Sequence, residues 1–352
     1  MNYSEQDVLK ALSHVDDPDL HKDLVTLNMI RNIVIKGNEL SFSVYLTTPA
    51  CPLKDMIENA CRNAISHFIG SEITVHINMT AEVTADKKTN AALPNVRNII
   101  AVGSGKGGVG KSTIAAGLAS TLSKMGANVG ILDADIYGPS IPILFGVQNH
   151  QIEMEVVEGK ELMKPVMADA IKLFSIGFLS NPNEAVVWRG PMISKALQQF
   201  ITGVNWGQLD YLIIDLPPGT GDIQLTLAQT LPISGAVIVT TPQNVAIADA
   251  RKACAMFKMQ PINIPILGIV ENMSYFIPDD APDKKYFIFG SGGAQQLAEQ
   301  FGTQVLGSLP ISVELMNDSD QGKMKDTDAL KNFTEIAQQL ARQLAINNSM
   351  NA

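Results

Sequence analysis

The chain has 352 residues, of which 46% are hydrophobic and 17% charged, which excludes a disordered protein and allows two domains with well-buried cores. Its formal net charge of −9 argues against nucleic-acid binding driven by overall positive charge. No apolar run reaches the roughly 20 residues of a membrane-spanning helix, and the first residues lack a signal-peptide pattern, so we expect a cytoplasmic protein without a membrane partner.

Residues 1–80 read as a compact α+β domain. The pattern predicts a helix over 5–13, a hairpin of strands 32–35 and 40–46, a helix over 53–68 and a strand over 73–79. Four apolar residues of the second hairpin strand alternate toward one face, namely Leu40, Phe42, Val44 and Leu46. Residues 81–95 are polar and without periodicity, which is typical of a linker.

Cys51 lies where the second hairpin strand meets the following helix. A thiol at a helix N-terminus has a lowered pKa and is a good ligand or nucleophile, although a small residue buried at a tight corner fits equally well. The corner Thr47-Thr48-Pro49-Ala50-Cys51-Pro52 resembles the SufT- and PaaD-like domain that precedes the ATPase in many Mrp proteins. That resemblance implies Cys51 as a candidate contact for a metal or an iron–sulfur cluster. Cys61 and Cys254 fall in apolar helical runs and are expected in the core.

A glycine-rich loop follows the predicted strand 98–102 and precedes an amphipathic helix that Gly126 ends. Strand, glycine loop and helix in this order predict a phosphate-binding site, because backbone N–H groups close on phosphate oxygens only where no Cβ intrudes. We expect Lys111 to neutralise the β and γ phosphates of ATP and the Ser112 hydroxyl to bind Mg²⁺. The loop consists of Gly105, Lys106, Gly107, Gly108, Val109, Gly110, Lys111, Ser112 and Thr113.

Lys106 is a second lysine in this loop. On its own it reads as a solvated charge. The run GKGGVGKST, however, resembles the deviant Walker A motif of the MinD, ParA and NifH class of ATPases. The resemblance implies a homodimer with ATP at the subunit interface, in which Lys106 acts on the partner's phosphates as an arginine finger does.

Two acids, Asp133 and Asp135, end the next apolar strand, at the sheet edge where open α/β folds bind ligands. One of them is suited to orient the attacking water, and a helix N-cap is the competing interpretation. The run DADIYGPS resembles switch I of Mrp and ApbC proteins. That similarity implies Asp135 as the residue that positions the water, with Asp133 supporting Mg²⁺ and the loop geometry.

Residues 148–172 are less regular and rich in glutamate, and we interpret them as a solvated insertion of unknown role. The run VWRGPM (187–192), with a predicted helix over 193–200, is again similar to Mrp proteins. Composition alone makes Trp188 a core or interface anchor.

Asp215 ends a buried strand and has the Walker B form, in which the aspartate holds a water on Mg²⁺. The next loop, DLPPGTGD, resembles switch II of the same family, which implies that the Gly219 backbone senses the γ-phosphate. Strands over 235–241 and 266–271 alternate with helices and predict a doubly wound, mostly parallel sheet. By similarity Asn272 and Pro310 border the adenine, although either also fits a turn.

The segment after Glu271-Asn272-Met273-Ser274 departs from the family pattern. Many Mrp and ApbC proteins carry a CxxC there, through which two subunits share a [4Fe–4S] cluster, but residues 275–286 contain no cysteine. The three aspartates of this stretch are hard oxygen donors, which suit Mg²⁺ or Ca²⁺ better than cluster iron.

The resemblance covers nearly the entire chain. It implies an Mrp/ApbC-type ATPase with domains 1–80 and 96–352, which dimerises and hydrolyses ATP to ADP and phosphate. The family role is to bind iron–sulfur clusters and transfer them to apoproteins, so client proteins and iron–sulfur assembly proteins are the expected partners. The alternative is an ATP-dependent dimerisation switch that controls a protein partner without carrying a cluster, and a nucleic-acid regulator is a weaker third.

Overall fold

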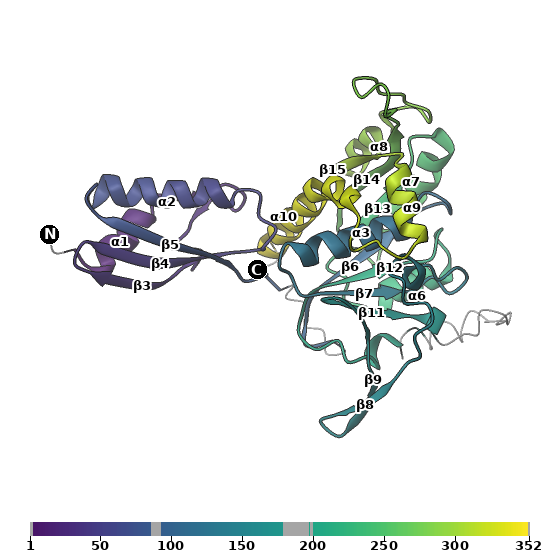
Figure 1. Cartoon of the computed structure of the whole chain (residues 1–352), viewed down its shortest axis with the longest axis horizontal. Coiled ribbons are helices and arrows are strands. Elements are labelled where there is room, and N and C mark those ends of the chain that lie inside the picture. Colours follow the sequence, from purple (N-terminus) through teal and green to yellow (C-terminus); the bar gives the residue numbers. More distant parts are fainter. Residues whose placement is uncertain (1–2, 86–92, 179–196, 198–199, 351–352) are drawn as a thin grey trace. The chain divides into compact units, whose positions relative to one another are not determined.

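The computed structural model describes residues 3–85, 93–178, 197 and 200–350. These residues form two compact units (Figure 1). The first comprises residues 1–85 and 341–352, and the second comprises residues 86–340. Residues 341–350, which the sequence analysis included in the segment 96–352, are grouped with the N-terminal unit.

The first unit has two helices on one face of a three-stranded sheet of order β3-β4-β5 (Figure 1). The α+β unit predicted from the sequence is confirmed, with boundaries shifted by at most two residues. Its core contains the alternating residues of β4 together with Cys61. The elements are α1 (Glu5–Leu12), β1 (Asp16–Asp17), β2 (Lys22–Asp23), β3 (Ile30–Lys36), β4 (Glu39–Leu46), α2 (Lys54–Phe68) and β5 (Thr74–Ala81).

The last turns of the final helix complete this unit through polar contacts. Arg342 donates to Asp19 Oδ1 from Nε at 2.7 Å, and its Nη2 lies 2.6 Å from the same oxygen. Asn348 Nδ2 donates to the Thr84 carbonyl at 3.0 Å. These contacts join residues more than 260 positions apart, which explains why no local pattern predicts them.

The second unit is built on an eight-stranded sheet of order β10-β11-β7-β12-β6-β13-β14-β15, in which every pair except β10–β11 is parallel. The predicted doubly wound, mostly parallel α/β fold is confirmed. The sheet strands are β6 (Val96–Gly103), β7 (Val129–Asp133), β10 (Val166–Ala168), β11 (Ile171–Ser175), β12 (Leu209–Asp215), β13 (Gly235–Thr240), β14 (Ile266–Tyr275) and β15 (Val305–Pro310). The helices are α3 (Lys111–Lys124), α4 (Ile141–Leu144), α6 (Asp222–Thr230), α7 (Asn244–Lys258), α8 (Gly293–Phe301), α9 (Val313–Asp320) and α10 (Thr334–Met350), with 3₁₀ turns η1 (Ile176–Phe178) and η2 (Asp328–Phe333).

The register of this sheet brings the predicted acids together. Asp215 on β12 pairs with Asp133 on β7, and on its other side with Val102 on β6. The carboxyl ends of these three parallel strands therefore lie side by side, where the loop after β6 begins. This is the sheet edge at which α/β folds bind ligands.

Residues 148–172 are more regular than the sequence analysis expected. Strands β8 (Met154–Val157) and β9 (Lys160–Met163) form a hairpin that extends away from the sheet (Figure 1). The next two strands, β10 and β11, join the main sheet beside β7. The irregular insertion is therefore corrected to a hairpin followed by two sheet strands. Of these, β11 pairs with β7, about 40 residues away in the sequence, and β10 pairs with β11.

Two sequence-based predictions lie outside the described residues. Trp188 and the rest of the run 187–192 are among them, as is most of the helix expected over 193–200.

Within the described ranges, no helix combines the length and the apolar character needed to cross a bilayer.

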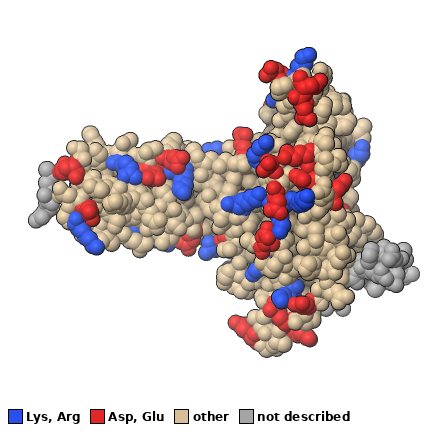
Figure 2. Space-filling view, viewed as in Figure 1, with Lys and Arg blue, Asp and Glu red and all other residues tan. Residues whose placement is uncertain are grey.

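Figure 2 shows the charged side chains on one face of the molecule. Lys and Arg lie next to Asp and Glu there and form no continuous basic surface among the described residues of that face.

Candidate functional site

The glycine loop joins β6 to α3, and two of its glycines are required by close approach. A Cβ at Gly105 would lie 2.0 Å from the backbone carbonyl of Asp249, and one at Gly110 would lie 2.2 Å from Asn272 Nδ2. Gly110 also has a φ of +83°, in the left-handed region that favours glycine, and it caps the N-terminus of α3. The loop therefore keeps its backbone bare where a helix begins, as an anion site requires.

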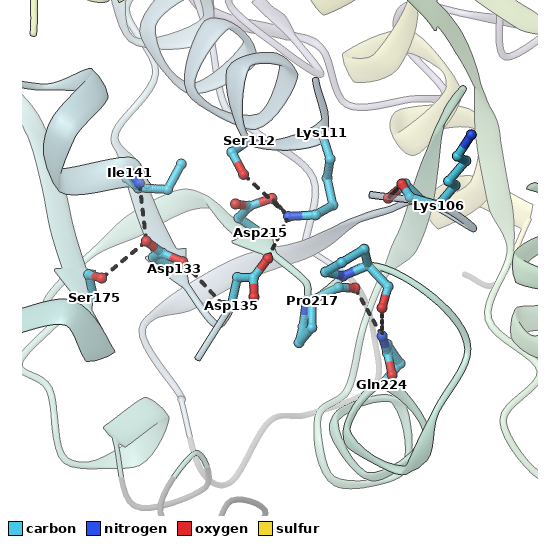
Figure 3. Close-up of polar contacts among 12 residues, drawn as sticks. Lys106, Lys111, Ser112, Asp133, Asp135, Ile141, Ser175, Asp215, Pro217 and Gln224 are labelled. Atoms are coloured by element: carbon cyan, nitrogen blue, oxygen red, sulfur yellow. Dashed lines mark hydrogen bonds and ion pairs between the residues drawn. The ribbon is translucent and has the colours of Figure 1, made fainter. Parts of the chain in front are cut away.

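Lys111 is buried between two carboxylates. Its Nζ lies 2.6 Å from Asp215 Oδ1 and 3.8 Å from Asp135 Oδ2, and it donates to Ser112 Oγ at 3.3 Å (Figure 3). The loop lysine, the strand-end acids and the first helical hydroxyl thus form one cluster, which brings together four residues that the sequence analysis had singled out separately.

Asp133 is fully buried and organises the backbone of the loop that follows β7. Its Oδ1 accepts from the Asp135 N–H at 3.1 Å, and its Oδ2 accepts from the Ile141 N–H and the Ser175 hydroxyl, each at 3.1 Å (Figure 3). Burial, followed by the nearby charge of Asp215, raises the pKa of Asp133 to about 8. Both carboxylate oxygens are therefore engaged by protein donors.

The carboxylates of Asp135 and Asp215 lie beside Lys111, and one oxygen of Asp215 accepts no hydrogen bond from the described residues. Burial raises the pKa of Asp135 and of Asp215, while the Lys111 ammonium opposes the rise at both. Asp215 Oδ2 is buried and has no hydrogen-bond partner among the described residues. A buried carboxylate oxygen without a donor is unusual, and it marks a place where a cation fits.

The loop after β12 is tied to the glycine loop by the backbone of Gly219, whose N–H donates to the Ser104 carbonyl at 2.9 Å. Gln224 Nε2 holds the same loop from the other side, donating to the carbonyls of Pro217 at 3.0 Å and Pro218 at 2.8 Å (Figure 3). The group expected to sense the γ-phosphate is thus engaged with the protein backbone in this structure.

Lys106 is exposed, and its side chain points away from the cluster around Lys111 (Figure 3). Its backbone carbonyl accepts from the Ser104 hydroxyl at 3.0 Å. No ion pair of its ammonium occurs within the part of the chain that the structure describes. The two lysines of the loop therefore have opposite environments.

Asn272 and Pro310, expected near the adenine, lie in adjacent strands. Asn272 is buried and donates from Nδ2 to the Val109 carbonyl of the glycine loop at 3.0 Å. Pro310 is half-buried at the end of β15 and pairs with Tyr275. The contact between Asn272 and the loop backbone was not predicted, because it joins residues 163 positions apart.

Sequence reasoning missed Ser175 and Gln224. Ser175 ends β11 and bonds Asp133, and the alternation of Ile171, Leu173 and Ser175 is the strand signal that could have found it. Gln224 carries no such signal, because its role depends on the fold of the preceding loop.

The lowered pKa expected for Cys51 is wrong. Helix α2 begins only at Lys54, so the thiol does not lie at the helix N-terminus. Burial raises the pKa of the half-buried Cys51, and the carboxylates of Asp17 and Asp19 add to the rise. No group of three or more His, Cys, Asp or Glu side chains suited to a metal ion occurs within the described ranges.

Cys61 and Cys254 are fully buried, as expected for core residues. Burial raises the pKa of each thiol to about 12. Neither is therefore an available thiolate at neutral pH.

Comparisons with known proteins agree with this geometry. Residues 95–345 match the ParA family, described as NUBPL iron-transfer P-loop NTPase, and residues 5–77 match a family described as iron-sulfur cluster assembly protein. The chain is 46% identical over 346 residues to an iron-sulfur cluster carrier protein of Synechocystis, covering 96% of this chain and 97% of that protein. It is 41% identical to the Escherichia coli iron-sulfur cluster carrier protein, covering 96% and 90%.

A solved structure resembles part of the chain. It is a nucleotide-binding protein of Archaeoglobus fulgidus in complex with ADP, 40% identical, with a TM-score of 0.59 over 69% of this chain and 93% of that one. Together with the matches over almost the full length, this likeness establishes that the chain belongs to the iron-sulfur cluster carrier family, with a ParA-type P-loop NTPase domain after an N-terminal iron-sulfur cluster assembly domain.

Proposed function

We propose that this chain binds ATP with Mg²⁺, hydrolyses it to ADP and phosphate as a homodimer, and uses this cycle to deliver iron–sulfur clusters to apoproteins. The observation that carries the proposal is the position of Lys111 at the start of α3, between Asp215 at the end of β12 and Asp135 in the loop after β7. The related Archaeoglobus protein was solved with ADP, which supports a nucleotide as the ligand of this loop.

The glycine loop supplies the phosphate contacts. Its backbone N–H groups and the positive end of the α3 dipole favour an anion, and Lys111 adds the charge that the β and γ phosphates need. Because Lys111 now pairs with Asp215, phosphate binding exchanges this ion pair for a lysine–phosphate contact. The carboxylate is then released toward a cation.

The donor set fits Mg²⁺. Asp215 Oδ2 is without a partner in the described residues, and the Ser112 hydroxyl lies in the same cluster; hard oxygen donors of this kind suit the ion. Asp133, which the sequence analysis also linked to Mg²⁺, has both oxygens engaged, so we assign it to the loop geometry alone. Mg²⁺, when bound, would neutralise charge on the β and γ phosphates.

In the hydrolysis step, water attacks the γ-phosphorus and the bond from that phosphorus to the bridging oxygen breaks, leaving ADP and inorganic phosphate. Asp135 is assigned to orient the water, since its carboxylate lies 3.8 Å from the ammonium of Lys111, the residue expected to bind the phosphates. The Gly219 N–H reaches the γ-phosphate only after it leaves the Ser104 carbonyl. Lys106, exposed and unpaired within the described residues, is free to act on the partner copy's nucleotide.

The number of accessible cysteines limits the ways in which this chain could bind an iron–sulfur cluster. A cluster shared through four thiolates of two copies needs two available cysteines per chain, and Cys51 alone is not fully buried. A symmetric four-thiolate [4Fe–4S] site therefore does not fit this chain. We propose Cys51 as the thiol contact of the cargo, with the remaining ligands supplied from outside the chain.

The second candidate function is the nucleotide switch. The burial of Cys61 and Cys254 favours it, because the chain then lacks the thiols for a cluster bridge. In this alternative, ATP-driven dimerisation controls a protein partner, with the N-terminal domain as adaptor.

Anaerobic reconstitution with iron and sulfide separates the two functions. For a carrier, we expect visible cluster absorbance in the wild type, its loss in Cys51→Ala, and its retention in the core control Cys254→Ala. A wild type that holds no stable cluster but dimerises with ATP would establish the switch instead. Absence of phosphate release from ATP would overturn the proposed hydrolysis, and absence of ATP-dependent dimerisation would overturn the switch.

A further inference from the structure

Residues 271–275, at the end of β14, lie between the glycine loop and an exposed loop formed by residues 276–288, here called the distal loop. The segment contacts the glycine loop at one end and opens directly into the distal loop at the other. Only four positions separate Asn272 from Phe276, where the distal loop begins. The segment is therefore placed to transmit a change from one to the other.

The contact with the glycine loop is specific. Asn272 Nδ2 donates to the Val109 carbonyl at 3.0 Å, and a Cβ on Gly110 would lie 2.2 Å from that nitrogen. Because a trans peptide points its C=O and N–H in opposite directions, the Gly110 N–H faces away from Asn272. A phosphate that binds this N–H therefore acts on the same peptide unit whose carbonyl Asn272 holds.

The middle of the segment has an unusual conformation. Met273 has a φ of +55°, which is costly for a residue with a long side chain, and the strand register shifts between Glu271 and Tyr275. A residue held in a costly conformation changes it more readily when its restraints change. Met273 thus places a strained backbone position directly after Asn272.

Glu271 and Ser274 close this turn. The Ser274 hydroxyl lies 2.8 Å from both the Glu271 carbonyl and its Oε2, and Glu271 Oε1 accepts from the Ala294 N–H at the start of α8 at 3.1 Å. The upstream end of the turn is therefore fixed to α8. At the downstream end the Tyr275 carbonyl accepts from the Ile311 N–H at 2.7 Å, and the distal loop begins at the next residue.

The distal loop is closed at its base and apolar at its surface. Phe276 and Tyr286 exchange two backbone hydrogen bonds of 2.9 Å each. Three consecutive residues, Tyr286, Phe287 and Ile288, are each about half exposed, at 49%, 53% and 58%. A small change at the base of the loop therefore alters an apolar surface that other molecules can contact.

We propose that residues 271–275 couple phosphate binding in the glycine loop to the conformation of the distal loop, with Asn272 as the positioning residue. The proposal rests on the proposed nucleotide binding and extends it, because nucleotide binding would then change the conformation of an exposed loop. In the carrier and switch functions alike, this surface would change between the nucleotide-free and nucleotide-bound forms.

Hydrogen exchange of the full chain, with and without Mg²⁺ and a non-hydrolysable ATP analogue, tests the coupling. We expect the analogue to change exchange at the Phe276 and Tyr286 amides of the wild type. Asn272→Ala and Ser274→Ala should lose this change at saturating analogue, with occupancy measured by a fluorescent nucleotide. Gln295→Ala, on the exposed side of α8, should retain it as a matched control.

Each outcome is decisive. If the analogue binds the wild type but leaves these amides unchanged, or if both segment variants keep the wild-type change, the coupling is refuted while nucleotide binding stands. If the wild type binds no analogue, the proposed function fails and the coupling fails with it.

Discussion

Lys111 Nζ lies 2.6 Å from Asp215 Oδ1, while the other oxygen of that carboxylate has no partner among the described residues. One oxygen balances the buried ammonium, and the other remains available to a cation. In this structure one oxygen of the carboxylate pairs with the lysine and the other is open, at the position where we propose that Mg²⁺ binds.

This division predicts the effect of Asp215→Asn. The variant leaves Lys111 with only the more distant Asp135, and removing one partner of a buried pair costs about 3 kcal/mol of unfolding free energy. It should also abolish the dependence of nucleotide affinity on Mg²⁺, measured by titration with Mg²⁺ and with EDTA. Asp210→Asn, at the opposite end of the same strand, serves as control. An Asp215→Asn protein whose affinity still rises with Mg²⁺ would contradict the metal assignment.

The two lysines of the glycine loop should behave differently. Lys111→Ala removes the buried charge beside the phosphates and should abolish nucleotide binding. Lys106→Ala removes an exposed charge and should leave binding intact while it slows hydrolysis and ATP-dependent dimerisation, followed by phosphate release and light scattering. Unchanged turnover in Lys106→Ala would refute its action on the partner's nucleotide.

Gly110 and Gly108 offer a matched pair. Both have positive φ values, +83° and +81°, so alanine strains the backbone at each by about 1–2 kcal/mol. Only at Gly110 does the new Cβ meet a side chain, Asn272 Nδ2 at 2.2 Å, whereas at Gly108 nothing lies within 4 Å. We expect the Gly110→Ala variant to lose more stability than Gly108→Ala in chemical denaturation.

A double variant isolates the steric part of this loss. Adding Asn272→Ala to Gly110→Ala removes the clash, so the two changes together should cost less than the sum of their separate effects. Strict additivity would mean that the loop and Asn272 do not meet as the structure places them.

The glycine loop and the strand-end acids were predictable because their signals are local. A strand, a glycine run and a helix follow one another within about 30 residues, and parallel strands bring their carboxyl ends to one edge. The contacts that the patterns missed are long-range. Asn272 meets Val109, and Ser175 meets Asp133, only after the sheet has formed.

Cys51 shows why local reasoning failed at a single residue. The pattern placed the thiol at a helix start, where the dipole lowers its pKa. In the structure α2 begins at Lys54, three residues after the thiol. The carboxylates that raise the pKa of the thiol, Asp17 and Asp19, lie more than 30 residues upstream. Burial by those distant elements decided the direction of the pKa shift.

The C-terminal residues should stabilise the N-terminal unit. Arg342→Ala removes the two contacts to Asp19, and because the arginine is about a third exposed, solvent limits the expected loss to about 0.5–1 kcal/mol. Ending the chain at Leu340 also removes the bond from Asn348 to Thr84 and should expose residues 1–85 to protease. Lys331→Ala, in the other unit, is the control for the point variant. Equal stability of Arg342→Ala and wild type in the N-terminal transition would contradict the assignment.

Asp133 makes the stability of the second unit depend on pH. Its pKa is about 8 in the folded chain against 3.8 for the ordinary carboxyl, so between about pH 4 and pH 8 the folded form holds a proton that the unfolded form has released. Stability is then greatest at the acidic end of this window and is lost as pH rises toward 8. The raised pKa values of Asp135 and Asp215 act in the same direction.

We expect the Tm of the wild type to fall between pH 5 and pH 8, and Asp133→Asn, which cannot titrate, to show a smaller fall. Since the comparison is between two pH values within each protein, a general loss of stability in the variant does not affect it. Equal falls in both proteins would show that Asp133 is ionised throughout this range.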